Sequence, residues 1–97
     1  MPDVEAIFCG SDQIAGGVAD TLRLLGRRVP RDIALIGFDN WEPMALGAEP
    51  PLTSIDMCLE DVGRVAAEHL LAAIHDEPTH GIHTVPCRLV VRGSTDP

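Results

Sequence analysis

The chain has 97 residues, of which 7 are basic and 15 are acidic, giving a formal net charge of −8 at pH 7. This length allows one small domain, or part of a larger one, with an adequate but modest core. A surface built to neutralise phosphates needs the opposite charge balance, so we expect no nucleic-acid binding by this chain. Apolar residues make up 45% of the sequence but tyrosine is absent, so the core must be largely aliphatic.

Three cysteines, Cys9, Cys58 and Cys87, are widely spaced and form no CxxC pair. Cys9 and Cys87 lie in apolar stretches, and we expect both to be reduced core residues. An odd number of such residues favours the cytoplasm over a disulfide-linked extracellular protein. The sequence has no basic-then-apolar leader and no apolar run of about 18 residues, so we expect neither secretion on its own signal nor a membrane span.

The first predicted elements are a short strand over Ala6–Cys9 and a helix that follows the turn at Gly10–Ser11. Apolar residues recur along this helix at the spacing of one helical face, namely Ile14, Val18, Leu22 and Leu25. We expect Asp12 to cap the N-terminus of the helix, Gly26 to end it and Pro30 to prevent its continuation.

Two glycines, Gly16 and Gly17, lie inside this predicted helix, where each costs about 1 kcal/mol relative to alanine. They are either a tolerated weakness or a place where a second backbone packs closely, from this chain or from a partner subunit. The residues alone leave these interpretations open.

The central feature of the sequence is the uncharged run Ile33–Gly37, which is followed at once by Phe38, Asp39, Asn40 and Trp41. A short apolar run is typical of a strand buried on both faces of a parallel sheet, which needs helices on both sides. Ligands of open α/β sheets bind beyond the carboxyl ends of the strands. Asp39 would stand at such an end and is our first candidate for a ligand contact.

The second half of the chain predicts a strand, a long helix and a final strand. Residues 42–49 form a loop or a single helical turn, Leu52–Ile55 a strand, Leu59 to about His75 a helix, and Leu89–Val91 a last strand. Strands that alternate with helices favour right-handed βαβ units. The predicted fold class is therefore α/β, with a mostly parallel sheet flanked by helices.

Catalytic and metal sites find little support in the residues. Asp12 and Asp39 could form a carboxylate pair at neighbouring strand ends, as used in acid–base or metal-assisted chemistry. However, we find no nucleophile with a paired base and no glycine-rich phosphate loop, and a Mg²⁺-binding receiver site would want a lysine, which the chain lacks. His75, His80 and His83 have no acid or cysteine partner at ligand spacing. We predict no catalytic residue, no metal site and no cofactor.

Four stretches together resemble the C-terminal part of LacI/GalR-type transcriptional regulators, namely AIFCGSDQIAGG, LLGRRVPRDIALIGFDN, EPPLTSI and LVVRGST. The resemblance as a whole covers nearly the entire chain, from Pro2 to Thr95. The resemblance implies part of a type I periplasmic-binding-protein-like fold, mainly its C-terminal lobe. Residues 1–97 would then be a fragment of the effector-binding domain, with segments that cross to a missing N-terminal lobe and without the DNA-binding headpiece.

The resemblance also implies a function. In this family a sugar or related small molecule binds between two lobes, and lobe closure alters the operator affinity of a helix-turn-helix headpiece. We therefore expect a non-enzymatic, effector-sensing part of a cytoplasmic regulator that contacts operator DNA only through a headpiece and binds sugar weakly or undetectably on its own. A periplasmic sugar receptor of a transporter is the alternative, ahead of a carboxylate-dependent enzyme.

The site residues follow from the same resemblance. It implies that Asp39 contacts the ligand and that Ser11 replaces a family asparagine that contacts it. Met57 stands where some members place a polar ligand contact, so it weakens the sugar contact or implies a less polar effector. Trp41 would stack on a sugar face, or else cover the core or a subunit contact. Asp12 fits the helix cap better than the ligand contact.

Association is expected through two surfaces. Family dimers form partly through the helix starting at Gln13 and the loop after the central strand, where Gly16 and Gly17 would suit a close subunit contact. The chain would cross between lobes near residues 55–59 and 85–89, which leaves the long helix to face the missing lobe. Its exposed apolar stripe would drive association, so we expect a homodimer or a swapped dimer.

Overall fold

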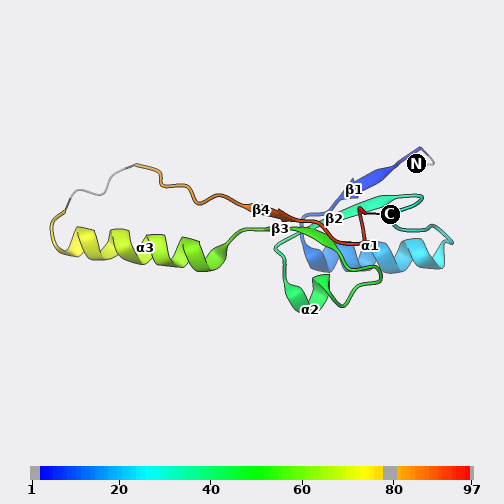
Figure 1. Cartoon of the computed structure of the whole chain (residues 1–97), viewed down its shortest axis with the longest axis horizontal. Helices are drawn as coiled ribbons and strands as arrows, with labels where there is room; N and C mark the ends of the chain where they lie inside the picture. The colour runs from blue at the N-terminus through cyan, green and yellow to red at the C-terminus, as the bar shows by residue number, and fades with distance from the viewer. Residues whose placement is uncertain (1–2, 78–80, 97) are drawn as a thin grey trace. The chain divides into compact units, whose positions relative to one another are not determined.

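The computed structural model describes residues 3–77 and 81–96 of the chain. Its elements follow the predicted order (Figure 1) and are β1 (Ala6–Phe8), α1 (Asp12–Leu24), β2 (Ala34–Phe38), α2 (Glu42–Ala45), β3 (Thr53–Asp56), α3 (Leu59–Ile74) and β4 (Arg88–Val90). The ends of the predicted strands and of the long helix are displaced by no more than one residue. His80 lies outside the described residues, so its part in a histidine cluster stays untested.

The chain divides into two compact units, one made of Met1–Asp56 with Leu89–Pro97 and the other of Met57–Arg88. The first unit contains β1, α1, β2, α2, β3 and most of β4, and the second contains α3. The chain therefore leaves the first unit after Asp56 and returns to it at Leu89. These two points fall within the crossing segments that the resemblance implies.

The first unit is built on a four-stranded sheet with the strand order β1-β2-β3-β4. β1 and β3 both pair parallel with β2, in a register that places Ile36 opposite Phe8 on one side and Thr53 on the other. The predicted α/β class and mostly parallel sheet are thus confirmed.

The prediction that the central strand is buried on both faces is wrong. Leu35 and Gly37 in β2 are buried, whereas the alternate residues Ala34, Ile36 and Phe38 are only partly buried. The core gathers on the first of these faces, where α1 and α2 lie (Figure 1), and it consists of Cys9, Ala15, Ala19, Leu35, Ala45 and Leu52. One-sided cover explains the alternation, since side chains of successive strand residues point to opposite faces.

The face that helix α1 turns to the sheet matches the predicted one only in part, since Leu22 is buried and Val18 packs against the core as predicted. Its buried apolar residues are Ala15, Ala19 and Leu22, whereas Ile14 is 57% exposed. Alanine has the shorter side chain, so the helix approaches β2 more closely over Ala15 and Ala19 than it could over isoleucine. The helix ends as predicted, with Gly26 just beyond it at a φ of 75°.

The N-cap of α1 is Ser11 rather than Asp12, which corrects the predicted helix cap. Ser11 Oγ accepts a hydrogen bond from the Ile14 N–H at 3.1 Å. Asp12 is only 1% exposed, and both of its carboxylate oxygens are used elsewhere: Oδ1 accepts from Ser54 Oγ at 2.7 Å and Oδ2 from the Trp41 N–H at 2.7 Å. One buried carboxylate thus joins the start of α1 to β3 and to the loop after β2.

Gly37 makes room for this carboxylate. A Cβ atom at Gly37 would overlap Oδ1 of Asp12 and would lie 3.4 Å from the Asp12 Cα. The glycine is therefore required by a close approach between β2 and the start of α1.

Ser94 joins β2 to β3 near the starts of both strands. It is fully buried, its Oγ donates to the Leu35 carbonyl at 2.5 Å, and the same oxygen accepts from the Thr53 N–H at 2.8 Å. Its own carbonyl accepts from the Leu35 N–H at 3.0 Å. The segment after β4 is thus part of the sheet's hydrogen-bonding pattern.

The second unit, Met57–Arg88, contains α3 with the residues that precede and follow it. No residue of α3 is buried, so its apolar stripe is exposed as predicted. Glu60 and Asp61 lie in its first turn, where acidic side chains interact favourably with the helix dipole. The rings of His69 and His83 stack with their centroids 3.9 Å apart.

Only one of the two predicted core cysteines is buried. Cys9 is buried, and burial raises the pKa of its thiol. Cys87 is exposed, contrary to our expectation, because it belongs to an irregular segment outside the core.

None of the helices in the described part of the chain has the length and apolar character that a membrane span requires.

We predict that Asp12→Asn lowers the free energy of unfolding by about 2 kcal/mol, because an amide cannot accept from both buried donors. Asp20→Asn is the matched control on the same helix. It removes only an exposed ion pair with Arg23 and should cost less than about 0.5 kcal/mol. Urea denaturation of both variants measures the difference, and equal losses would contradict the assigned role of Asp12.

Gly37→Ala should cost about 1–3 kcal/mol, because the new methyl group overlaps the Asp12 carboxylate. The cost should be at least halved in an Asp12→Ala background, where that carboxylate is absent. A double-mutant cycle from denaturation curves tests this coupling. Additive losses would mean that Gly37 does not serve to admit Asp12.

Candidate functional site

The loop that follows β2, residues 39–41, is held at each of its three backbone N–H groups. Every acceptor belongs to β3 or to α1, in these pairs: Asp39 N–H to Ile55 O at 2.9 Å, Asn40 N–H to Ser54 Oγ at 2.9 Å, and Trp41 N–H to Asp12 Oδ2 at 2.7 Å. The neighbouring elements of the sheet therefore fix the backbone of this loop.

Two residues of the loop have unusual backbone conformations as a result. Asp39 has a φ of 117° and Asn40 a φ of 51°. Residues other than glycine rarely adopt positive φ values, and each such residue costs about 1–3 kcal/mol, so these conformations persist only where the surroundings impose them. Strain of this kind is commonly found at ligand-binding sites.

The side chain of Asp39 is left open to a ligand. The residue follows directly on Phe38, the last residue of β2, and is exposed. Within residues 3–77 and 81–96 its carboxylate accepts no hydrogen bond and forms no ion pair. A carboxylate on a fixed backbone, with both oxygens open, can accept from two adjacent ligand hydroxyls.

Asn40 is held through its side chain as well as its backbone. Its Nδ2 donates to Asp56 Oδ2 at 3.2 Å, and its Oδ1 accepts from Arg92 Nη2 at 2.7 Å. Arg92 Nη1 donates to the Leu52 carbonyl at 2.8 Å. The amide of Asn40 thus bridges the last residue of β3 and the segment after β4.

Ser11 and Trp41 are two further predicted ligand contacts. Trp41 belongs to the same loop as Asp39. Ser11 follows β1, and because β1 and β2 are parallel neighbours, Ser11 and Asp39 stand at the same edge of the sheet. Ser11 Oγ accepts the capping bond, which leaves its hydroxyl hydrogen free to donate. The Trp41 side chain is 47% exposed.

The remaining predicted residues are placed differently. Met57 is partly buried and is the first residue of the second unit. Gly16 packs against α2 of its own chain, since a Cβ there would lie 3.2 Å from Met44 Sδ. Gly16 therefore packs closely within its own chain, which is one of the two interpretations that the sequence left open, and the subunit contact at this residue stays a prediction. Gly17 is exposed, with nothing within 4 Å of a Cβ position.

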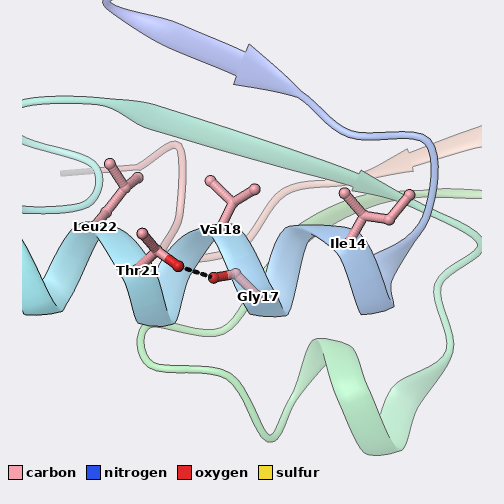
Figure 2. A pocket seen from close by; sticks show the side chains of 5 residues that line it. All are labelled: Ile14, Gly17, Val18, Thr21 and Leu22. Atoms are coloured by element: carbon pink, nitrogen blue, oxygen red, sulfur yellow. Dashed lines mark hydrogen bonds between the residues drawn. The ribbon is translucent and has the colours of Figure 1, made fainter.

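An open apolar groove of about 440 Å³ runs along α1 and includes Gly17 (Figure 2). It is lined by Ile14, Gly17, Val18, Thr21 and Leu22. The one side-chain hydroxyl in this set, that of Thr21, donates to the Gly17 carbonyl at 3.0 Å. Because its polar groups are paired with each other, the groove presents a mainly apolar surface.

Metal binding finds no support in the described ranges, where no group of three His, Cys, Asp or Glu side chains could hold an ion.

Away from the site, hydrogen bonds from Arg28 hold the pKa of Asp32 below its ordinary value.

Sequence reasoning did not single out four residues that support the loop: Asn40, Ser54, Asp56 and Arg92. Three of them fall within the stretches GFDN, EPPLTSI and LVVRGST that carry the family resemblance. Ser54 and the adjacent Thr53 are polar residues between Leu52 and Ile55 in the predicted strand, and this is the signal that could have pointed to buried partners. Asp56 and Arg92 gave no such signal.

Comparison with known proteins gives a consistent result. Residues 1–95 match the family described as periplasmic binding protein-like domain. The chain is 40% identical over 94 residues to the HTH-type transcriptional regulator CelR of Thermobifida fusca, covering 96% of this chain and 27% of that regulator. The chain thus spans about a quarter of the length of this relative.

Solved structures agree with this match. A transcriptional regulator CelR–cellobiose complex superimposes with a TM-score of 0.83 at 40% identity, over 96% of this chain and 28% of that one. The lac repressor dimer bound to operator and the anti-inducer ONPF gives a TM-score of 0.87 at 30% identity, over 94% and 27%. The resemblance to LacI-type regulators is therefore confirmed, and the chain belongs to the family of periplasmic binding protein-like domains, in the form that these regulators carry.

Proposed function

We propose that this chain senses a sugar or a related polyhydroxylated molecule as part of a LacI-type transcriptional regulator. Residues 1–97 contribute the C-terminal lobe of the effector-binding domain together with segments that cross to a second lobe. Effector binding favours a closed arrangement of the lobes and thereby changes operator affinity. Operator contact is made through a helix-turn-helix headpiece, and the regulator is cytoplasmic.

The observation that carries this proposal is the Asp39 carboxylate, exposed on a backbone fixed at three consecutive N–H groups. Vicinal hydroxyls of a sugar are donors that a carboxylate accepts in pairs, and a fixed backbone reduces the entropy lost on binding. The indole of Trp41 offers an apolar face to the C–H groups of a sugar ring, and the Ser11 hydroxyl offers a donor.

The relatives support a binding role in regulation. The CelR structure holds cellobiose, and the lac repressor structure is bound to operator DNA. Both are regulators rather than enzymes, and we propose that this chain is likewise non-catalytic. Asp12, which could have formed a carboxylate pair with Asp39, already accepts two hydrogen bonds inside the unit.

We further propose that two copies associate through the groove on α1. The groove is apolar and includes Ile14, which is 57% exposed on a helix that packs into the core through other residues. Covering such side chains removes apolar surface from water. The lac repressor, with which the chain shares its fold, is described as a dimer.

The isolated chain should bind cellobiose with a Kd of about 1 mM or weaker, because contacts from a second lobe are absent. Amide shifts in a ¹H–¹⁵N NMR titration should nevertheless map to residues 39–41 and to the Trp41 indole. Asp39→Asn should weaken binding about tenfold or more, since asparagine tolerates positive φ but lacks the second acceptor oxygen and the charge.

Asp20→Asn is the control for this titration, since Asp20 lies on an exposed face of α1 and pairs with Arg23. It should leave the shifts unchanged. Shifts that map away from residues 39–41, or that persist in Asp39→Asn, would contradict the assigned site. Sucrose and lactose in the same titration extend the test to other disaccharides.

Ile14→Glu should raise the dimer dissociation constant about tenfold or more, because a charge would be placed in the apolar contact. Leu24→Glu is the matched control, since Leu24 is on the same helix, outside the groove and 87% exposed. Sedimentation velocity over a range of concentrations measures both. An equal effect of the two substitutions, or a monomeric wild type at every concentration, would contradict the proposed dimer surface.

A further inference from the structure

We propose that Asn40 is a positioning residue that links the ligand-binding loop to both segments by which the chain passes between its two units. This inference rests on the proposed function, since it assigns to Asn40 the transmission of a ligand contact at Asp39. It concerns only contacts inside the first unit.

The two side-chain partners of Asn40 lie near the points where the chain leaves the first unit and returns to it. Asp56 is the last residue of β3 and the last residue before the chain leaves the first unit. Arg92 follows β4, three residues after the chain returns at Leu89. The Asn40 side chain therefore contacts the outgoing segment through Nδ2 and the returning segment through Oδ1.

The two hydrogen bonds of the Asn40 side chain are of the strong, charge-assisted kind. Both partners carry a formal charge, and hydrogen bonds to charged groups are about twice as strong as those between neutral groups. Arg92 is itself anchored to β3, because Nη1 donates to the Leu52 carbonyl and its backbone N–H donates to Thr53 Oγ1, both at 2.8 Å. The bridge therefore has one end fixed on the sheet and the other at the exit point.

Asn40 is connected directly to the proposed ligand contact, Asp39, through the backbone. Asp39 and Asn40 share a peptide group, and both have positive φ values. The N–H of this peptide donates to Ser54 Oγ, so a ligand bound at the Asp39 carboxylate holds the peptide, and with it the Asn40 side chain, in the orientation described. Because that side chain is bonded at both ends, the ligand thereby also stabilises the positions of Asp56 and Arg92 relative to each other.

The experiment compares Asn40→Gly with Asp39→Gly in the full 97-residue chain. Glycine accepts positive φ at either position, so neither substitution strains the loop. Only Asn40→Gly removes the bridge, whereas Asp39→Gly removes the proposed ligand contact. Amide hydrogen exchange is measured in the two crossing segments, residues 55–59 and 85–89, and in the core at Ala19 and Leu35.

We expect Asn40→Gly to raise exchange about tenfold in both crossing segments and to leave the core amides unchanged. Asp39→Gly should leave exchange unchanged in the crossing segments. A uniform rise through the core would show a merely stabilising role and would overturn the proposal, as would a rise in only one segment or in none. If Asn40→Gly fails to fold, Arg92→Lys serves instead, since a lysine ammonium cannot reproduce the two-armed contact of the guanidinium, and should affect the same segments.

A second readout uses cellobiose as the probe. In the wild type, NMR shifts on cellobiose addition should extend from residues 39–41 into both crossing segments, and in Asn40→Gly they should stop at the loop. Shifts that still reach the crossing segments in Asn40→Gly would overturn the linking role. Absence of any shift in the wild type would count against the proposed function, whereas the exchange measurement decides the role of the bridge without a ligand.

Discussion

A single buried negative charge, the carboxylate of Asp12, organises the first unit. An ionised carboxylate that is 1% exposed is unfavourable unless its oxygens accept hydrogen bonds, and here Ser54 and the Trp41 N–H each supply one. Gly37 is the residue that this arrangement requires on β2. Because Trp41 belongs to the loop after β2, the charge that holds α1 on the sheet also fixes the backbone that carries Asp39.

The order and type of the elements could be predicted because they depend on apolar patterns that are local in the sequence. The face of α1 that packs on the sheet could not be predicted fully in this way. The spacing of the larger apolar residues placed Ile14 on the buried face, whereas in the structure the short side chains of Ala15 and Ala19 face the sheet. How closely a helix approaches a strand is a property of the assembled unit, and periodicity carries no information about it.

In the candidate site, too, the features that depend on adjacent residues could be predicted, whereas the contacts between residues far apart in the sequence could not. Asp39 could be predicted because a polar residue directly after an apolar strand lies at the carboxyl edge of a parallel sheet. Its supports could not, since Arg92 meets Asn40 across 52 positions of sequence and Ser54 meets Asp12 across 42. The predicted cap of α1, Asp12, was wrong for the same reason, because distant donors bind its carboxylate and Ser11 caps the helix instead.

Asp12 and Asp39 stand at neighbouring strand ends in opposite environments, and this difference bears on the choice between catalysis and binding. Acid–base or metal-assisted chemistry with two carboxylates needs both to reach the substrate or the ion. Asp12 is buried and each of its oxygens is occupied by an internal donor, so it contributes to structure alone. Asp39, open and fixed, is left as a single acceptor group, and a single positioned acceptor suits recognition of hydroxyl groups better than it suits bond cleavage.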